Sequence, residues 1–295
     1  MKDYIIGFKD YLKNQKKSSD NTLESYLRDI GQFLLYCNSN NINDVQDISA
    51  VTIEKYNSYL ALNGKSKATV TRVAASMRCF FLYLTNIGAI FSNPVLNVKF
   101  EKAEKKLPEV LTSREVNLLL SQPDGSDYKS VRDKAMLELL YATGIKVSEL
   151  IDLSVNDVNL QIGILHMRSA KTERIIPMYP AAIKAVAAYI ANVRPIIVTE
   201  SNEDRLFTNM NGSSLSRQGF WKIIKHYAAM ADIEKDITPH TLRHSFAAHL
   251  LENGAQLTDI KEMLGHSDIS STQIYAQIMK NKYTQAYKRF HPLAR

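Results

Sequence analysis

The sequence predicts a mainly α-helical protein of two domains, the second containing a small antiparallel β-sheet. A length of 295 residues fits two domains, each large enough to bury its own core. Along most of the chain, apolar residues recur at the helical spacing of three and four. Two short β-like runs, residues 163–167 and 174–178, flank a charged turn, which is the pattern of a hairpin.

Residues 1–100 contain four amphipathic segments and no convincing strand. The second follows the cap-rich run Ser19 to Thr22, and the third starts near Thr52. Apolar side chains mark the four helices at Tyr4, Ile5, Phe8, Tyr11 and Leu12; at Leu23, Tyr26, Ile30, Phe33 and Leu34; at Ile53, Tyr56 and Leu60; and at Val70, Val73, Met77, Phe80, Phe81 and Leu84. We therefore expect a compact helical bundle.

Residues 101–110 are the best candidate for a linker, because they are polar, contain a proline and lack apolar periodicity. Positive charge collects before them. Between Asn63 and Leu107 there are eight lysines and arginines but only two glutamates. Their net charge of +6 is nearly the whole net charge of the protein, which is +7. This concentration favours a helix and strap that contact phosphates, with a solvated helix face as the alternative.

Residues 111–295 form the second predicted domain. A helix begins after Thr112, and a longer apolar helix ends at Gly144, followed by another helix through Leu150. The hairpin comes next, and the chain after Tyr179 is again mostly helical.

Composition excludes several classes of protein. Hydrophobic content of 45% and charged content of 23% exclude a mainly disordered or fibrous chain. No window approaches 18 unbroken apolar residues, and the charged amino terminus does not have the order of a signal peptide, so we expect a cytoplasmic protein. A pI near 9.1 favours a polyanionic partner such as nucleic acid.

The candidate chemistry lies in the last third of the chain. Thr238 and Pro239 predict a helix start that places His240 and Arg243 on one face near a positive helix end, which suits an anion. His266 follows a glycine, and Tyr275 comes nine residues later. His240 and His244 have the spacing of a metalloprotease helix, but such a helix needs a glutamate where Thr241 stands.

The order of these motifs resembles the tyrosine recombinase and integrase family, most closely its Xer-type members. The resemblance covers nearly the whole chain. It is carried by residues 66–84, LLYATGIKVSEL at 139–150, ERIIPM at 173–178, LSRQGFWKIIKHY at 215–227, ITPHTLRHSFAAHLLENGA at 237–255, LGHSDISSTQIY at 264–275 and the tail at 290–292.

This resemblance implies a helical, SAM-like core-binding domain over 1–100 and a mostly α catalytic domain over 111–295, which close around duplex DNA. It implies strand exchange by a tetramer, through a 3′-phosphotyrosyl intermediate and without metal or cofactor. Tyr275 would be the nucleophile, Arg243, His240 and His266 would stabilise the transition state, and Lys171 would protonate the leaving oxygen.

Two departures from the family pattern bear on activity. Lys146 stands where the family motif has an arginine, which keeps the charge but loses the bidentate fork. The hairpin turn is about one residue shorter, and Lys171 is its one lysine. A slow recombinase and a catalytically silent DNA-binding protein are both compatible with these changes, and an RNA-binding helical protein is a third possibility.

DNA contacts are also expected outside the catalytic residues, from the basic fourth helix of the first domain and, by the resemblance, from the segment that precedes and begins the helix around Trp221. They are Lys67, Arg72 and Arg78 in the first domain, and Arg217, Gln218 and Lys225 in the second. For each of them, exposed charge without DNA is the alternative. The segment 282–295 would dock into a neighbouring protomer, or else fold back on its own domain.

Overall fold

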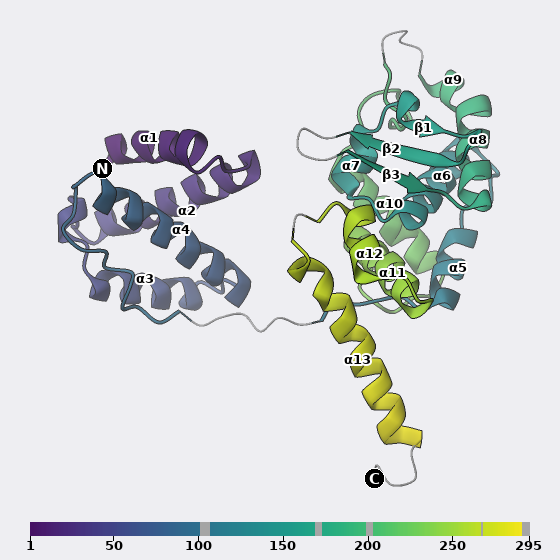
Figure 1. The fold of residues 1–295 in the computed structure, drawn as a ribbon. Coiled ribbons are helices and arrows are strands. Elements are labelled where there is room, and N and C mark those ends of the chain that lie inside the picture. Colours follow the sequence, from purple (N-terminus) through teal and green to yellow (C-terminus); the bar gives the residue numbers. More distant parts are fainter. Residues whose placement is uncertain (101–106, 169–172, 199–202, 267, 291–295) are drawn as a thin grey trace. The chain divides into compact units, whose positions relative to one another are not determined.

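The computed structural model describes residues 1–100, 107–168, 173–198, 203–266 and 268–290 (Figure 1). The chain divides into two compact units, Met1–Lys106 and Leu107–Arg295. Of the expected linker, residues 101–106 lie outside the described residues. The prediction of a mainly helical protein with a small antiparallel sheet is confirmed. No helix of the described parts has the length and apolar character needed to cross a bilayer.

Unit 1 is a helical bundle that buries an aromatic core. Its helices are α1 (Lys2–Asp10), η1 (Tyr11–Gln15), α2 (Asp20–Ser39), η2 (Val45–Asp47), α3 (Ala50–Leu62) and α4 (Lys67–Asn86). The side chains of Ser19, Ser49 and Ser66 cap α2, α3 and α4 by accepting a hydrogen bond from a first-turn backbone N–H. Phe8, Phe33, Phe80 and Phe81 are fully buried between these helices.

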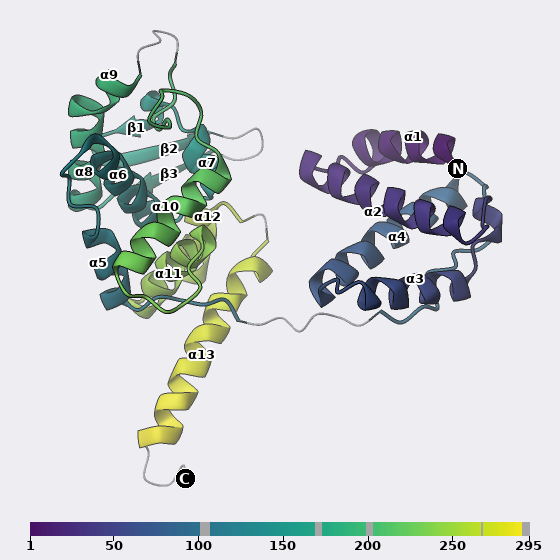
Figure 2. The same cartoon turned by 180° about the vertical axis from the view of Figure 1, so that it is seen from behind.

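In unit 2, helices pack against a three-stranded sheet (Figures 1 and 2). The elements are α5 (Ser113–Ser121), α6 (Tyr128–Thr143), α7 (Val147–Asp152), η3 (Val155–Asp157), β1 (Val158–Asn159), β2 (Ile164–Arg168), β3 (Glu173–Pro177), α8 (Pro180–Asn192), α9 (Arg194–Ile197), α10 (Arg217–Met230), α11 (Pro239–Glu252), α12 (Leu257–Leu264) and α13 (Ser270–Phe290).

The predicted hairpin is β2 paired antiparallel with β3, in a register that sets Leu165 opposite Ile176 and Arg168 opposite Glu173. A short third strand, β1, extends the sheet in the order β1-β2-β3. Leu165 and Ile176 are fully buried against the core of unit 2, whereas Ile175 on the other face is largely exposed. The sheet is therefore packed on one face, as antiparallel sheets often are.

Helix α6 ends where the sequence predicts, at Gly144 in the left-handed conformation with φ of 59°. A Cβ at this position would lie 2.3 Å from Cδ1 of Phe246 on α11 and 3.0 Å from Cδ2 of Leu264 on α12. The absence of a side chain thus lets α6 end against the two helices that carry Arg243 and lead to His266.

We expect Gly144→Ala to destabilise unit 2 by about 2 to 5 kcal/mol, because a left-handed alanine is strained and its methyl group would overlap Phe246. Denaturant unfolding monitored for unit 2 measures the change. Gly254→Ala is the matched control, since Gly254 also has a positive φ of 93° but open space around its Cβ position. It should cost only the strain, about 1 to 2 kcal/mol. Equal losses in the two variants would contradict the packing argument.

Candidate active site

Helix α11 begins as predicted, with Thr238 as cap and Pro239 in the first turn. The Thr238 and Thr241 side chains each accept a hydrogen bond from the other's backbone N–H, at 3.3 and 3.1 Å. This fixed start places His240, Arg243 and His244 within the first two turns of α11. His240 is exposed, Arg243 is buried and His244 is half-buried.

Arg243 lies at the centre of the site with only 4% of its surface exposed. Nη1 donates to the backbone oxygen of Gly144, and Nη2 donates to the backbone oxygen of Leu264 at 2.7 Å and to Nε2 of His266 at 3.0 Å. Burial lowers the pKa of Arg243, while the nearby Glu149 carboxylate raises it. The guanidinium, which remains charged in proteins, therefore ties together the end of α6, the end of α12 and His266.

His266 follows Gly265, which ends α12 in the left-handed conformation. Because arginine has no acceptor, Nε2 of His266 must accept from Arg243, so its proton is on Nδ1, 3.0 Å from Oγ1 of Thr272 on α13. Burial and the charges of Arg243 and Lys146 lower the pKa of His266 to about 4, which keeps the ring neutral. In this state Nε2 of His266 accepts a hydrogen bond from Arg243 and carries no proton.

Tyr275 lies on α13 with 1% of its surface exposed. Its ring packs in a cluster with Phe246, Ile260 and Leu264. Its Oη is 3.0 Å from Nδ1 of His244, and the two ring centroids are 5.7 Å apart. Burial raises the pKa of the phenol and Arg243 lowers it. The structure thus places Tyr275 near Arg243 within one chain, with its hydroxyl bonded to His244.

An ion pair borders the site beside Lys146. The exposed Lys146 precedes α7, and its backbone N–H donates to Oε2 of Glu149 at 2.7 Å. The same oxygen accepts from Nη2 of Arg174 at 2.8 Å, and Nε of Arg174 donates to the backbone oxygen of Met263 at 3.0 Å. Arg174 therefore joins β3, α7 and the end of α12, next to His266.

The sequence did not single out His244, Glu149 and Arg174 as site residues. Two weak signals were available: His244 directly follows Arg243, and Glu149 has the spacing of a capping residue after Lys146. The long-range contacts that give these residues a place in the site could not be derived from such local signals.

His240 and His244 lie one helical turn apart, with ring centroids 6.4 Å apart. Within the described ranges, no group of three histidine, cysteine or acidic side chains is arranged to hold a metal ion. Lys171 lies outside the described residues. On the strands on either side of residues 169–172, Nε2 of His166 on β2 is 2.5 Å from Oε1 of Glu173 on β3, and Nη2 of Arg168 is 3.3 Å from Nδ1 of His166.

Two of the expected DNA contacts have partners inside the protein. Nη1 of Arg72 is 2.7 Å from both carboxylate oxygens of the buried Asp29, so Arg72 neutralises a carboxylate that burial would otherwise destabilise. Lys225 forms an ion pair with Asp236, and its Nζ lies 5.4 Å from the centroid of the Trp221 ring. Both side chains thus have partners within the protein, and their contact with DNA stays a prediction.

The other expected contacts lie on the surface of their own units. Lys67 and Arg78 are exposed on α4, and the guanidinium of Arg78 lies 5.3 Å from the Phe100 ring centroid. Arg217 and Gln218 are exposed in the first turn of α10. Their placement at the amino ends of helices, or on an open face, leaves them accessible to an anionic backbone.

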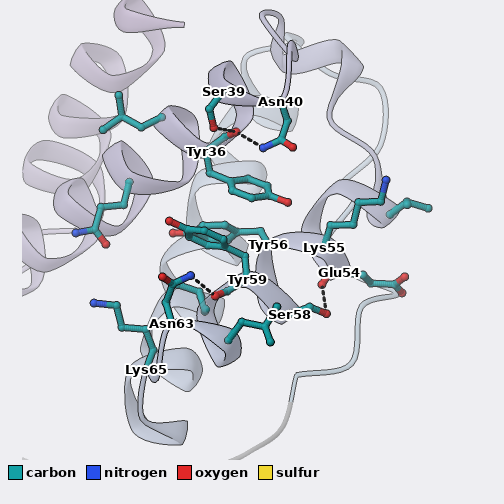
Figure 3. Close-up of a pocket in the computed structure, with 15 residues that line it drawn as sticks. Tyr36, Ser39, Asn40, Glu54, Lys55, Tyr56, Ser58, Tyr59, Asn63 and Lys65 are labelled. Carbon is teal, nitrogen blue, oxygen red and sulfur yellow. Dashed lines mark hydrogen bonds between the residues drawn. The ribbon is translucent and has the colours of Figure 1, made fainter.

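A groove of about 1020 Å³ in unit 1 is separate from these residues (Figure 3). The close-up shows the rings of Tyr36, Tyr56 and Tyr59 gathered between α2 and α3, and the centroid of Tyr36 is 5.0 Å from each of the other two. Leu35 and Leu62 on its rim are largely exposed. The groove contains none of the predicted site residues.

Comparison with known proteins matches both units to family models. Residues 109–282 match the phage integrase family, and residues 5–88 match the N-terminal SAM-like domain of phage integrases. The tyrosine recombinase XerD of Halalkalibacterium halodurans is 44% identical over 289 residues, covering 97% of each chain. The tyrosine recombinase XerD of Listeria innocua is 42% identical over the full length of both chains.

Solved structures show the same fold. The XerA recombinase is 26% identical, covers 98% of this chain and 99% of its own, and has a TM-score of 0.54. The XerH recombinase bound to its difH substrate, in a post-cleavage complex, has a TM-score of 0.78 at 20% identity, covering 96% of this chain and 84% of its own. A lambda integrase dimer bound to a core site has a TM-score of 0.71 at 16% identity, covering 93% and 94%.

Proposed function

The chain belongs to the phage integrase family of tyrosine recombinases, and on that basis we propose that Tyr275 is the nucleophile with which it cleaves DNA. It is a site-specific, XerD-like recombinase that exchanges DNA strands. One observation supports the assignment of the residues. Nη2 of Arg243 on α11 donates to His266 after α12, and the other ring nitrogen of His266 is bonded to Thr272 on α13. Tyr275 on the same helix is bonded to His244, which directly follows Arg243.

The reaction needs a nucleophile and stabilisation of negative charge, and the site has groups for both. Oη of Tyr275 attacks a phosphodiester, the bond to the 5′-oxygen breaks, and a 3′-phosphotyrosyl link forms with a free 5′-hydroxyl. A second strand's 5′-hydroxyl reverses the step. Because the phosphotyrosyl link stores the bond energy, the residues need no cofactor for rejoining. Arg243 stabilises the charge that develops on the non-bridging oxygens.

DNA binding must rearrange the donors of the site. At least three of the five guanidinium N–H groups of Arg243 are engaged by Gly144, Leu264 and His266. An arriving phosphodiester takes the place of His266 as acceptor. Its negative charge also raises the pKa of His266, so the imidazolium then donates to the phosphate. Exposed His240 adds a donor from the first turn of α11, and Lys171 protonates the leaving 5′-oxygen.

Lys146 serves as the second cation of the phosphate site. Its charge lowers the pKa of His266, so the two side chains are near one another, and its side chain is exposed at the edge of the site. A lysine supplies charge at this position without the paired N–H groups of an arginine. We therefore infer that Lys146 makes the reaction slower than an arginine would, but does not abolish it.

We expect Lys146→Arg to raise the rate of covalent adduct formation, by up to about 10² to 10³-fold, because the planar fork adds a second donor to the transition state. A nicked suicide duplex, which traps the phosphotyrosyl adduct, gives the rate in single-turnover conditions. Lys55→Arg on the exposed face of α3 is the control and should leave the rate unchanged. An unchanged rate in Lys146→Arg would remove Lys146 from the phosphate site.

The same assay tests the rival function, a silent recombinase-like protein that binds DNA without cutting it. The substitution at Lys146 is the observation that favours this rival. Binding of the duplex without an adduct in the natural chain, and an adduct in Lys146→Arg, would support it. An adduct in the natural chain that disappears in Tyr275→Phe supports the enzyme.

We further propose that duplex DNA is held by both units, with residues 1–100 as the core-binding domain, 101–110 as linker and 111–295 as the catalytic domain. Lys67, Arg78, Arg217 and Gln218 supply contacts to the DNA, and cytoplasmic location accords with this substrate. The protein acts as a tetramer, alone or with a second recombinase. The last turns of α13 project from the body of unit 2, which suits docking into a neighbouring protomer (Figures 1 and 2).

A further inference from the structure

We propose that His244 is the base that takes the phenolic proton of Tyr275 when Oη attacks phosphorus. This inference rests on the proposed function and assigns a catalytic role to a residue outside the set that the sequence predicted. It is carried by a direct contact with the reacting atom: Nδ1 of His244 lies 3.0 Å from Oη of Tyr275. That distance is within the range a general base requires.

The other two histidines of the site are not placed for this step. His266 has both ring nitrogens engaged, Nε2 with Arg243 and Nδ1 with Thr272. His240 is exposed in the first turn of α11, with its ring 6.4 Å from that of His244. Within the described parts of the chain, the hydroxyl of Tyr275 has one hydrogen-bond partner, which is His244.

The proton balance follows from the neutral state of the ring. His244 carries its proton on Nε2 and accepts the phenolic hydrogen bond at Nδ1. In the forward step the Oη–H bond breaks, the proton moves to Nδ1, the Oη–P bond forms and the P–O5′ bond breaks. The departing oxygen takes a proton from a separate acid. In rejoining, a 5′-hydroxyl gives its proton back to the conjugate base of that acid as it attacks phosphorus. The Oη–P bond breaks, and His244 returns its proton to the departing phenolate of Tyr275.

The charges around His244 make this base dependent on substrate. Four groups face His244: His240 and Arg243 on α11, His266 after α12 and Tyr275 on α13. Further charges, on Lys146, Glu149 and Arg174, shift the pKa values of Arg243 and His266.

Burial, and then His240, Arg243 and His266, lower the pKa of His244 to about 4. Burial raises the pKa of Tyr275, so proton transfer is strongly uphill in the free protein and the nucleophile stays protonated.

A bound phosphodiester changes this balance. Its negative charge offsets the positive charge of Arg243, which raises the pKa of His244 and makes it a better acceptor for the proton. Arg243 at the same time favours the phenolate. The hydroxyl of Tyr275 is thus inert until a phosphate occupies the site.

The test compares His244→Asn and His244→Phe with the natural chain on a nicked duplex whose scissile 5′-oxygen is replaced by sulfur. A thiolate leaves without an acid, so the adduct rate then reports the nucleophile's side of the reaction alone. At pH 7 we expect both variants to be slower by about 10² to 10⁴-fold. The deficit should shrink as the pH rises, because a growing fraction of the phenol then loses its proton without a base.

Other outcomes separate the alternatives. If the variants form the adduct more slowly by the same factor at every pH, and their thermal unfolding is unchanged, the assignment is overturned. The role of His244 would then be structural. Faster adduct formation in both variants would also overturn it, since the contact would then restrain the nucleophile.

His226→Asn, an exposed histidine on α10, is the control and should match the natural chain. A natural chain that forms no adduct even on the sulfur substrate would overturn the proposed function and the base together. A normal adduct with unchanged His244 variants would overturn the base alone.

Discussion

Tyr275→Phe is expected to bind duplex DNA like the natural chain and to form no covalent adduct. The substitution removes only the hydroxyl that attacks phosphorus. The ring, which is 1% exposed and packs against Phe246, Ile260 and Leu264, keeps its contacts. The lost hydrogen bond to His244 costs about 1 kcal/mol, too little to unfold the unit. Trapping on a nicked suicide duplex, resolved by denaturing electrophoresis, measures the adduct.

Tyr128→Phe is the matched control for this variant, because Tyr128 is half exposed on α6, away from the site residues. It should form the adduct at the natural rate. A phosphotyrosyl adduct that persists in Tyr275→Phe would place the nucleophile on another residue, and mass spectrometry of the DNA-linked peptide would identify it. Loss of both binding and adduct would point to a folding defect, which thermal unfolding of the variant detects.

Periodicity predicted much of the fold, because the apolar residues on the buried face of a helix recur every three or four positions. Thr238 with Pro239 predicted the start of α11, and Gly144 predicted the end of α6. The strand β1 was not predicted, since two residues are too few to show an alternating pattern. Its pairing with β2 depends on contacts with the rest of the sheet, which no local pattern records.

The site was predictable as far as helix spacing and resemblance extend. They indicated Arg243, His266 and Tyr275, and in the structure Arg243 is bonded to His266 and interacts electrostatically with Tyr275. The contact between His244 and Tyr275 joins residues 31 apart, and the pair of Arg174 with Glu149 joins residues 25 apart. Spacing within a helix shows which side chains share a face, but not which distant segment that face meets.

The first domain shows the same limit for charge. Counting basic residues placed Arg72 among the DNA contacts, although its guanidinium is bonded to Asp29, 43 residues earlier in the chain. Asp29 is 1% exposed, so its carboxylate needs a positively charged partner. The sequence around it does not show that this aspartate of α2 is buried. A net positive patch in a sequence therefore overestimates the charge that is available to a ligand.

Arg243→Lys is expected to lower the rate of adduct formation by about 10³-fold or more while retaining DNA binding. Loss of one oriented donor at a developing oxyanion costs about 10² to 10³ in rate, and lysine replaces a planar set of N–H groups with one ammonium. Binding should change little, because this phosphate contact is one of many. Single-turnover adduct formation and a binding titration on the same duplex separate the two effects.

The variant should also be less stable, since Arg243 donates to the buried backbone oxygens of Gly144 and Leu264. Leaving either oxygen without a donor costs about 1 to 3 kcal/mol, so the unfolding midpoint of unit 2 should fall. Arg205→Lys, in a partly exposed pair with Glu203, is the control and should change neither rate nor stability appreciably. Because lysine keeps the charge, a rate within tenfold of the natural chain would show that Arg243 acts by charge alone. The hydrogen-bonding geometry of the guanidinium would then have no part in stabilising the transition state.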